Sequence, residues 1–191
     1  MIIYFLTKNR GKLREARTIL SKFGVEVEQL KEDREEIQSE DLEEIAIHSI
    51  RNVKARKLPI VVEDAGLFIN ALNGFPGPYS SYVYKTIGCR GILKLMKDVK
   101  NREAMFKSAV AYTDGKTTNV FIGKVEGVIA FEERGQEGFG FDPIFIPSGC
   151  NETFAEMGFE RKCLISHRAK AFEAFGSWLL KRKVNNMNRR G

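Results

Sequence analysis

A polar loop at residues 7–12 contains side chains that could hold an anion. Its sequence, TKNRGK, follows the apolar run 2–6 and precedes a helical pattern. A strand that ends where a helix begins offers backbone N–H groups beside a hydroxyl, an amide and an ammonium, so the loop could bind phosphate. The alternative is an ordinary helix N-cap with a solvated lysine, and the glycine and lysine spacing of a Walker A loop is absent. The groups in question belong to Thr7, Asn9, Gly11 and Lys12.

Carboxylates at two further places are suited to a divalent cation. Glu36 lies in the segment REEIQ, and Glu63 and Asp64 stand where we expect the buried strand 59–63 to end. Adjacent carboxylates raise each other's pKa unless a cation neutralises them, and Mg²⁺ prefers few carboxylates together with water and phosphate oxygens. Ten acidic residues crowd positions 26–44, so the alternative for Glu36 is a solvated side chain.

Two segments near the C-terminal end could together bind a planar base. The sequence GFGFDP at 138–143 offers aromatic ring faces in a glycine-flanked loop, and KCLISHR at 162–168 offers hydrogen-bond donors. The alternative reading places one phenylalanine in the core and makes Ser166 the N-cap of the last helix. The candidate base-binding residues are Phe139, Gly140, Phe141, Asp142, Lys162, His167 and Arg168.

The hydrophobic pattern predicts the elements that must position these groups. The first 70 residues alternate between strand and helix patterns, which favours an α/β sheet with parallel neighbours. Further on, two long strand patterns flank Asp114-Gly115, a two-residue hairpin signal, so antiparallel pairing is expected there. The predicted elements are strands at 2–6, 25–30 and 59–63, helices from Leu13 to Phe23, from Leu42 to before Pro59, over 91–99 and over 167–183, and a loop at 132–147.

Composition limits the class of protein. The chain has 191 residues, three cysteines without a CxxC pair, and two histidines far apart, which argues against a disulfide framework and a zinc site. We expect a soluble, cytoplasmic protein, because no apolar run is long enough for a membrane span or a signal peptide. The net charge of +6 lies almost wholly in residues 181–191, so it is weak evidence for nucleic-acid binding. We expect one domain over 1–184 and a polar basic tail at 185–191.

The motifs taken together resemble the inosine triphosphatase family, the non-canonical purine nucleoside triphosphate pyrophosphatases. The resemblance covers residues 2 to about 183, with the motifs in the family's order. It implies an elongated, two-lobed α/β protein around a long mixed β-sheet with flanking helices, an active site in the cleft between the lobes, and a homodimer. The motifs are TxNxxK at 7–12, EIxxxxLEEIA at 36–46, EDAGL at 63–67, GFPGPYS at 74–80, GFGFDP at 138–143, FAEM at 154–157 and SHR at 166–168.

The resemblance also implies roles for individual residues. It assigns Thr7, Asn9, Lys12 and Lys54 to the triphosphate. Glu36 and Asp64 are assigned to Mg²⁺, and Asp64 is also the group that activates or orients water. Phe139 would stack on the base, while Asp142, Lys162, His167 and Arg168 would contact the edge of the base or the α-phosphate. Two positions depart from the usual pattern, since Ala65 replaces a serine of the family's DSGL motif and Phe141 stands where some members carry tryptophan.

These residues predict a Mg²⁺-dependent pyrophosphohydrolase. It would convert inosine, deoxyinosine or xanthosine triphosphate to the monophosphate and pyrophosphate, and so remove non-canonical nucleotides from the pool. One alternative is the same chemistry on another modified nucleotide, such as a pyrimidine triphosphate. The other is a nucleotide- or RNA-binding module without turnover. No membrane and no stable nucleic-acid partner is expected.

Overall fold

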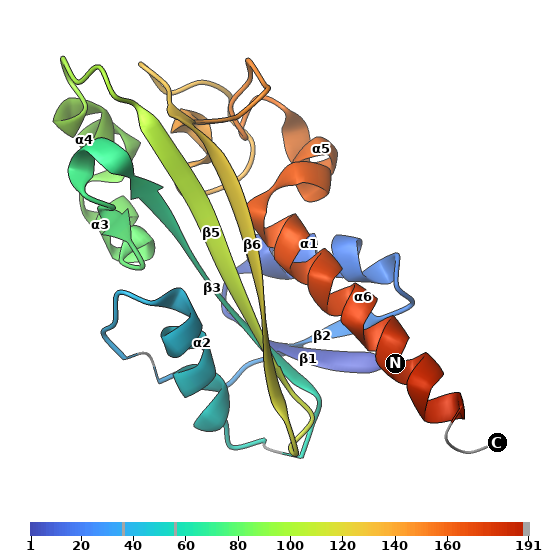
Figure 1. Cartoon of the computed structure of the whole chain (residues 1–191). Helices are drawn as coiled ribbons and strands as arrows, with labels where there is room; N and C mark the ends of the chain where they lie inside the picture. Colours follow the sequence, from blue (N-terminus) through green and yellow to red (C-terminus); the bar gives the residue numbers. More distant parts are fainter. Residues whose placement is uncertain (36, 56, 189–191) are drawn as a thin grey trace.

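A seven-stranded mixed sheet forms the centre of the molecule in the computed structural model, which describes residues 1–35, 37–55 and 57–188 (Figure 1). The strand order is β2-β1-β3-β5-β6-β7, and β4 pairs with β3 beside this path. The strands are β1 (Ile2–Leu6), β2 (Glu26–Leu30), β3 (Ile60–Ile69), β4 (Pro76–Gly77), β5 (Glu103–Thr113), β6 (Thr118–Ile129) and β7 (Phe145–Pro147).

Helices cover both faces of the sheet. Figure 1 shows α2 and the α3–α4 pair on one side of the long strands, and α1, α5 and α6 on the other. One hydrophobic core lies under α1 and α6 and another under α2. A third core lies between α4 and the segment around β7. The helices are α1 (Arg10–Ser21), α2 (Leu42–Arg51), α3 (Ser80–Thr86), α4 (Gly88–Leu95), α5 (Gly158–Ile165) and α6 (His167–Asn188), with short 3-10 turns η1 (Asn70–Leu72) and η2 (Asp142–Ile144).

The sheet is parallel at one end and antiparallel elsewhere, which confirms both expectations from the sequence. Strands β2, β1 and β3 run parallel, whereas β3, β5, β6 and β7 pair antiparallel. The long strands β3, β5 and β6 therefore extend beyond the parallel part and give the molecule its elongated shape (Figure 1). The predicted α/β fold with a long mixed sheet and flanking helices is confirmed.

One edge of β3 changes partner along its length. Strand β1 pairs with its start, at Tyr4 opposite Ile60 and Phe5 opposite Val61, and β4 pairs with its far part, beginning at Leu67 opposite Gly77. Between these two partners neither β1 nor β4 pairs with residues 62–66. The acidic pair Glu63-Asp64 lies in this interval, so side chains have access to the backbone there.

The expectation that the strand ends at residue 63 is wrong. Strand β3 continues to Ile69, because β5 pairs with it from Ile60 opposite Thr113 to Ile69 opposite Ala104. Glu63 and Asp64 therefore lie within a strand and point to opposite faces of the sheet. The acidic pair occurs at the end of the parallel part rather than at the end of the strand.

Several other boundaries differ from expectation. Helix α4 ends at Leu95, and Asp98 beyond it has a left-handed φ of 61°, which does not continue a helix. The β5–β6 connection has four residues, in which Asp114 Oδ1 accepts hydrogen bonds from the backbone of Lys116 and Thr117. Helix α5 was not predicted. Helix α6 continues to Asn188, so residues 185–188 of the expected tail are helical, and 189–191 lie outside the described residues.

In the part of the chain that the structure describes, no helix has the length and apolarity to cross a membrane.

Candidate active site

The loop before α1 is organised by its own polar side chains. Asn9 caps the helix, because its Oδ1 accepts a hydrogen bond of 3.0 Å from the backbone N–H of Lys12. The backbone N–H of Asn9 in turn donates to Thr7 Oγ1 at 3.1 Å. The N-cap alternative is therefore confirmed, and the same arrangement fixes the loop conformation. A phosphate-binding role for Thr7, Asn9 and Lys12 stays a prediction.

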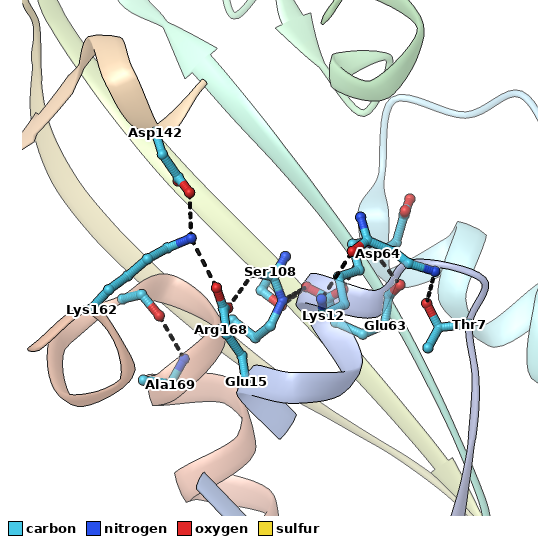
Figure 2. Close-up of polar contacts among 12 residues, drawn as sticks. Thr7, Lys12, Glu15, Glu63, Asp64, Ser108, Asp142, Lys162, Arg168 and Ala169 are labelled. Carbon is cyan, nitrogen blue, oxygen red and sulfur yellow. Dashed lines mark hydrogen bonds and ion pairs between the residues drawn. The ribbon is translucent and has the colours of Figure 1, made fainter. Parts of the chain in front are cut away.

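An ion-pair chain runs from this loop to the 138–143 segment (Figure 2). Lys12 Nζ lies 2.8 Å from Glu63 Oε2, and Arg168 Nε donates to Glu63 Oε1 at 3.1 Å. Arg168 Nη1 donates to Glu15 Oε2 at 2.7 Å, and Lys162 Nζ lies 2.9 Å from the other oxygen of Glu15. Lys162 Nζ also lies 2.6 Å from Asp142 Oδ2. We call the six residues Lys12, Glu63, Arg168, Glu15, Lys162 and Asp142 the ion-pair chain.

The ion-pair chain is stable because its signs alternate. Except for Lys12, its side chains are at most 3% exposed, and an unpaired charge at such a depth costs several kcal/mol. Burial alone would raise the pKa of Glu63, but the charges of Arg168 and Lys12 hold that pKa well below its usual range. Ser108 Oγ adds a hydrogen bond of 2.7 Å to Glu63 Oε1. The ion pairs thus fix the position of Lys12, at one end of the ion-pair chain, relative to Asp142 at the other end.

Phe139 packs against two cationic members of the ion-pair chain. Lys162 Nζ lies 4.5 Å and Arg168 Cζ 5.3 Å from its ring centroid. A Cβ atom on Gly11 would lie 2.6 Å from Phe139 Cδ1, so only glycine allows the ring to approach the start of α1 this closely. Two predicted subsites, the phosphate loop and the aromatic loop, are therefore in direct contact.

The two phenylalanines of the aromatic loop lie in different surroundings, and their predicted contacts with a base stay predictions. Phe141 is 2% exposed and packs edge to face on Tyr84, with ring centroids 5.5 Å apart. Its neighbour Gly140 has a φ of +65°, which turns the backbone between the two rings. Phe141 thus belongs to the core, as the alternative reading of one of the two rings allowed, and Phe139 is the partly exposed ring.

Asp142 and His167 are each 2% exposed, and their predicted contact with the edge of the base stays a prediction. Asp142 Oδ2 accepts from the backbone N–H of Phe139 at 2.8 Å as well as pairing with Lys162, so it holds the aromatic loop. His167 stacks on Phe106 with ring centroids 4.5 Å apart. Burial, and then the charge of Arg168, lower the pKa of His167 well below its usual range, so its imidazole is neutral at pH 7. Ser166 Oγ accepts from the backbone N–H of Ala169 at 3.1 Å and caps α6, as predicted.

Asp64 faces the other side of the sheet. Its side chain is 16% exposed, and Arg34 Nη2 lies 3.5 Å from its Oδ1. Ala65 follows it, half-buried. Lys54 is exposed, and its backbone N–H donates to Glu32 Oε1 at 2.6 Å. Glu36, the second predicted metal ligand, lies outside the described residues.

The donor set fits a magnesium–phosphate site better than a metal cage made of protein alone. Among residues 1–35, 37–55 and 57–188, no group of three or more histidine, cysteine, aspartate or glutamate side chains could hold a metal ion. The carboxylate of Glu63 is occupied by Lys12, Arg168 and Ser108, whereas that of Asp64 is partly accessible. Mg²⁺ typically binds through one or two carboxylates together with water and substrate phosphates, and Asp64 can supply such a ligand.

Sequence reasoning missed Glu15 and Arg34. Glu15 shares a helical stripe with Ala16 and Ile19, so its position on the buried face of α1 was detectable from spacing. Arg34 sits in an acid-rich segment, where a solvated side chain was the natural expectation, yet only 15% of its side chain is exposed. Ser108 gave no signal, because one hydroxyl in a buried strand has no characteristic spacing.

Comparisons with known proteins place the chain in a family. Residues 3–178 match the sequence pattern of the Ham1 family. The chain is 53% identical over 180 residues to a dITP/XTP pyrophosphatase of Methanopyrus kandleri, covering 93% of this chain and 96% of that protein. It is 51% identical over 187 residues to a dITP/XTP pyrophosphatase of Pyrococcus horikoshii, covering 97% of this chain and 98% of that protein.

A solved structure shows the same fold. The Ham1 protein of Staphylococcus aureus superposes with a TM-score of 0.82 at 29% identity, covering 95% of this chain and all of that one. The predicted resemblance is therefore confirmed over almost the whole chain. On the sequence match over residues 3–178, the relatives that are about half identical to it and the shared fold, the chain belongs to the Ham1 family.

Proposed function

We propose that this chain hydrolyses non-canonical purine nucleoside triphosphates to the nucleoside monophosphate and pyrophosphate. The observation that carries the proposal is the contact between the capped loop before α1 and the aromatic loop, with the accessible Asp64 carboxylate nearby on β3. The relatives named dITP/XTP pyrophosphatase support deoxyinosine and xanthosine triphosphates as substrates, and we extend the proposal to inosine triphosphate because it carries the same base as deoxyinosine triphosphate. The protein would act in the cytoplasm to remove such nucleotides from the pool.

The residues divide between binding and chemistry. Thr7, Asn9 and Lys12, at the start of α1, would bind the triphosphate, with Lys54 contributing a further positive charge. Asp64 would orient the attacking water and hold Mg²⁺ together with Glu36. When bound, Mg²⁺ would neutralise negative charge that develops on the phosphate oxygens. The protein itself would supply positioning and electrostatic stabilisation rather than a covalent intermediate.

Base selection would arise at the aromatic loop. Phe139 offers a partly exposed ring face, and Lys162 and Arg168, which the ion-pair chain holds beside that ring, would supply the donors to an acceptor on the base edge. A 6-oxo purine presents such an acceptor, whereas adenine presents a donor. A site built for one pattern can reject the other by about 10⁴-fold, because mismatched buried polar groups stay unpaired. Inosine and xanthosine triphosphates should therefore be hydrolysed best, GTP less well and ATP least.

The test is to measure pyrophosphate and orthophosphate separately while the purified chain acts on a panel of nucleotides with Mg²⁺. We expect pyrophosphate from inosine, deoxyinosine and xanthosine triphosphates. Orthophosphate as the first product would contradict cleavage at the α-phosphate. Comparable kcat/KM for ATP and inosine triphosphate would contradict the proposed base recognition, and faster turnover of a modified pyrimidine would favour that substrate class. A module that only binds nucleotide or RNA would release no pyrophosphate, and its RNA affinity would fall steeply with salt.

We also propose that the protein is a homodimer. Three tyrosines on and next to α3 support an interface there, since their side chains are 43–69% exposed and aromatic residues are enriched at protein interfaces. Light scattering after size-exclusion chromatography should give twice the 21.7 kDa of one chain. Tyr82→Glu should shift the mass to the monomer, while a monomeric mass for the unaltered protein would contradict the proposal. The tyrosines are Tyr79, Tyr82 and Tyr84.

A further inference from the structure

Arg34 is half-buried beside Asp64 although it comes from an acid-rich segment. Its side chain is 15% exposed, and its three guanidinium nitrogens reach three different groups. Nη1 donates to the carbonyl oxygen of Glu63 at 3.1 Å, Nε donates to Ser49 Oγ at 2.9 Å, and Nη2 lies 3.5 Å from Asp64 Oδ1. Arg34 therefore contacts both the backbone and the carboxylate of the acidic pair.

The carbonyl of Glu63 is available to Arg34 because of the way β3 changes partner. Strand β1 pairs with β3 as far as Val61, and β4 takes over at Leu67. Within this interval the Glu63 carbonyl accepts from Arg34, with Lys12 Nζ 3.5 Å away on the same oxygen. Buried carbonyls need a donor, so two cationic side chains here take the place of a neighbouring strand.

Ser49 holds the guanidinium from the opposite side. It lies on α2 and is 1% exposed. Its Oγ accepts from Arg34 Nε and donates to the carbonyl oxygen of Glu35 at 3.1 Å, so it fixes both the side chain and the backbone next to Arg34. The guanidinium is planar and its donors form a rigid fork, which makes such a three-way arrangement specific to arginine.

We propose that Arg34 is a positioning residue for the hydrolytic step, holding the Asp64 carboxylate in the orientation that the reaction requires. The proposal rests on the proposed function, because it assigns Arg34 a role through Asp64. Contact with the preceding carbonyl sets the backbone of Asp64, and the adjacent nitrogen sets its carboxylate. Reaction geometry is sensitive to such placement, since a displacement of about 1 Å can lower a rate by about 10²-fold.

Kinetics separate this role from phosphate binding. Arg34→Gln should lower kcat for inosine triphosphate by about 10-fold or more, while KM changes by less than about 3-fold. Arg34→Lys should lose nearly as much, because an ammonium is a point charge and cannot span the three partners. A raised KM with an unchanged kcat would overturn the proposal, since that pattern belongs to a residue that binds substrate equally in ground and transition states. An unchanged kcat and KM would overturn it as well.

Chemical rescue separates positioning from fold maintenance. Arg34→Ala should regain part of its lost kcat when millimolar guanidinium chloride is added, because the ion can occupy the space between Ser49 Oγ and the Glu63 carbonyl. The added salt should not rescue Asp64→Asn. A fall in kcat that guanidinium does not reverse, accompanied by an equal fall in the folded fraction measured by circular dichroism, would overturn the proposal.

Two further variants complete the design. Ser49→Ala keeps Arg34 but removes one of its supports, so kcat should fall less than for Arg34→Gln and KM should again change little. Lys31→Ala removes the same charge from an exposed position of the same segment and should leave kcat unchanged. If Lys31→Ala lowers kcat as much as Arg34→Gln, the effect is one of net charge and the proposal fails. Absence of pyrophosphate release by the unaltered protein would instead refute the proposed function itself.

Discussion

Two adjacent carboxylates on β3, those of Glu63 and Asp64, face opposite sides of the sheet and have different surroundings. The Glu63 side chain is fully buried, with Arg168, Lys12 and Ser108 around its two oxygens. The Asp64 side chain is 16% exposed and lies next to Arg34. Strand alternation sends one carboxylate into a closed ionic network and leaves the other within reach of a substrate.

The difference indicates that the two carboxylates have different roles, one structural and one in the reaction. A carboxylate whose oxygens are occupied by two cations and a hydroxyl can organise those groups but is poorly placed to hold a metal or a water. A carboxylate that solvent reaches can hold a metal ion and a water molecule. We therefore expect changes on the Glu63 side to act mainly on stability and changes on the Asp64 side to act mainly on turnover.

The largest effect on stability should come from Glu63→Gln. The amide keeps the shape of the side chain but leaves Arg168 and Lys12 without a compensating charge, and breaking a buried pair in this way costs about 3–5 kcal/mol. Urea denaturation should report that loss in the free energy of unfolding. Glu126→Gln, at an exposed position on β6, should change it by less than about 0.5 kcal/mol. A Glu63→Gln protein as stable as the unaltered one would contradict the stabilising role that we assign to Glu63.

Asp64→Asn should show the opposite pattern. Loss of the group that orients water should lower kcat by about 10²-fold or more, the scale on which general-base assistance acts. The free energy of unfolding should stay within about 1 kcal/mol, because this side chain is partly exposed and is not part of the ion-pair chain. Steady-state pyrophosphate release and urea denaturation on the same preparation provide both numbers. Near-full activity would remove Asp64 from the mechanism.

A pH titration sharpens the comparison on the buried face. Because the folded-state pKa of His167 is well below 6.5, the unfolded chain takes up its proton at a higher pH than the folded protein. The stability that the neutral histidine contributes is therefore complete above about pH 6.5 and is lost as the pH falls below it. Between about pH 6.5 and 5.5, where ordinary glutamates with a pKa of 4.5 are still largely ionised, this contributes up to about 1.4 kcal/mol per pH unit to the slope of unfolding free energy.

His167→Gln should remove that part of the slope. The control is Gln136→Asn at an exposed loop position, an uncharged replacement that should leave the slope as it is. The quantity to compare is the difference between each variant and the unaltered protein across the same pH series. Equal slopes for His167→Gln and the unaltered protein would show that His167 is not kept neutral by the fold.

The smallest expected effect concerns Ala65, which follows the acidic pair. A serine there could regain one hydrogen bond to substrate, worth ~0.5–1.5 kcal/mol, and raise kcat/KM by several-fold. Ala71→Ser in the exposed turn η1 serves as the control and should change nothing. An unchanged or lower kcat/KM for Ala65→Ser would mean that another group already makes the contact.

Local features of the fold could be predicted because their causes are local. The caps at Asn9 and Ser166 satisfy N–H groups only three residues away, so residue type and position are enough to infer them. The alternation of apolar runs likewise predicted the parallel strands and the antiparallel pair around Asp114. Boundaries that depend on a partner were less accessible, as the continuation of β3 past the acidic pair shows, since pairing with β5 and, from Leu67, with β4 extends it.

The sequence by itself determined the kinds of chemical group available and the family to which the motifs belong, because motif spacing and hydrophobic period are properties of the chain. Only the tertiary structure decided which partners the charged groups have. Glu15 and Arg168 meet across 153 positions, and Arg34 reaches the Glu63 carbonyl across 29. A buried charge must be neutralised by whatever the folded chain brings within about 4 Å, and that pairing depends on how strands and helices pack rather than on neighbouring residues.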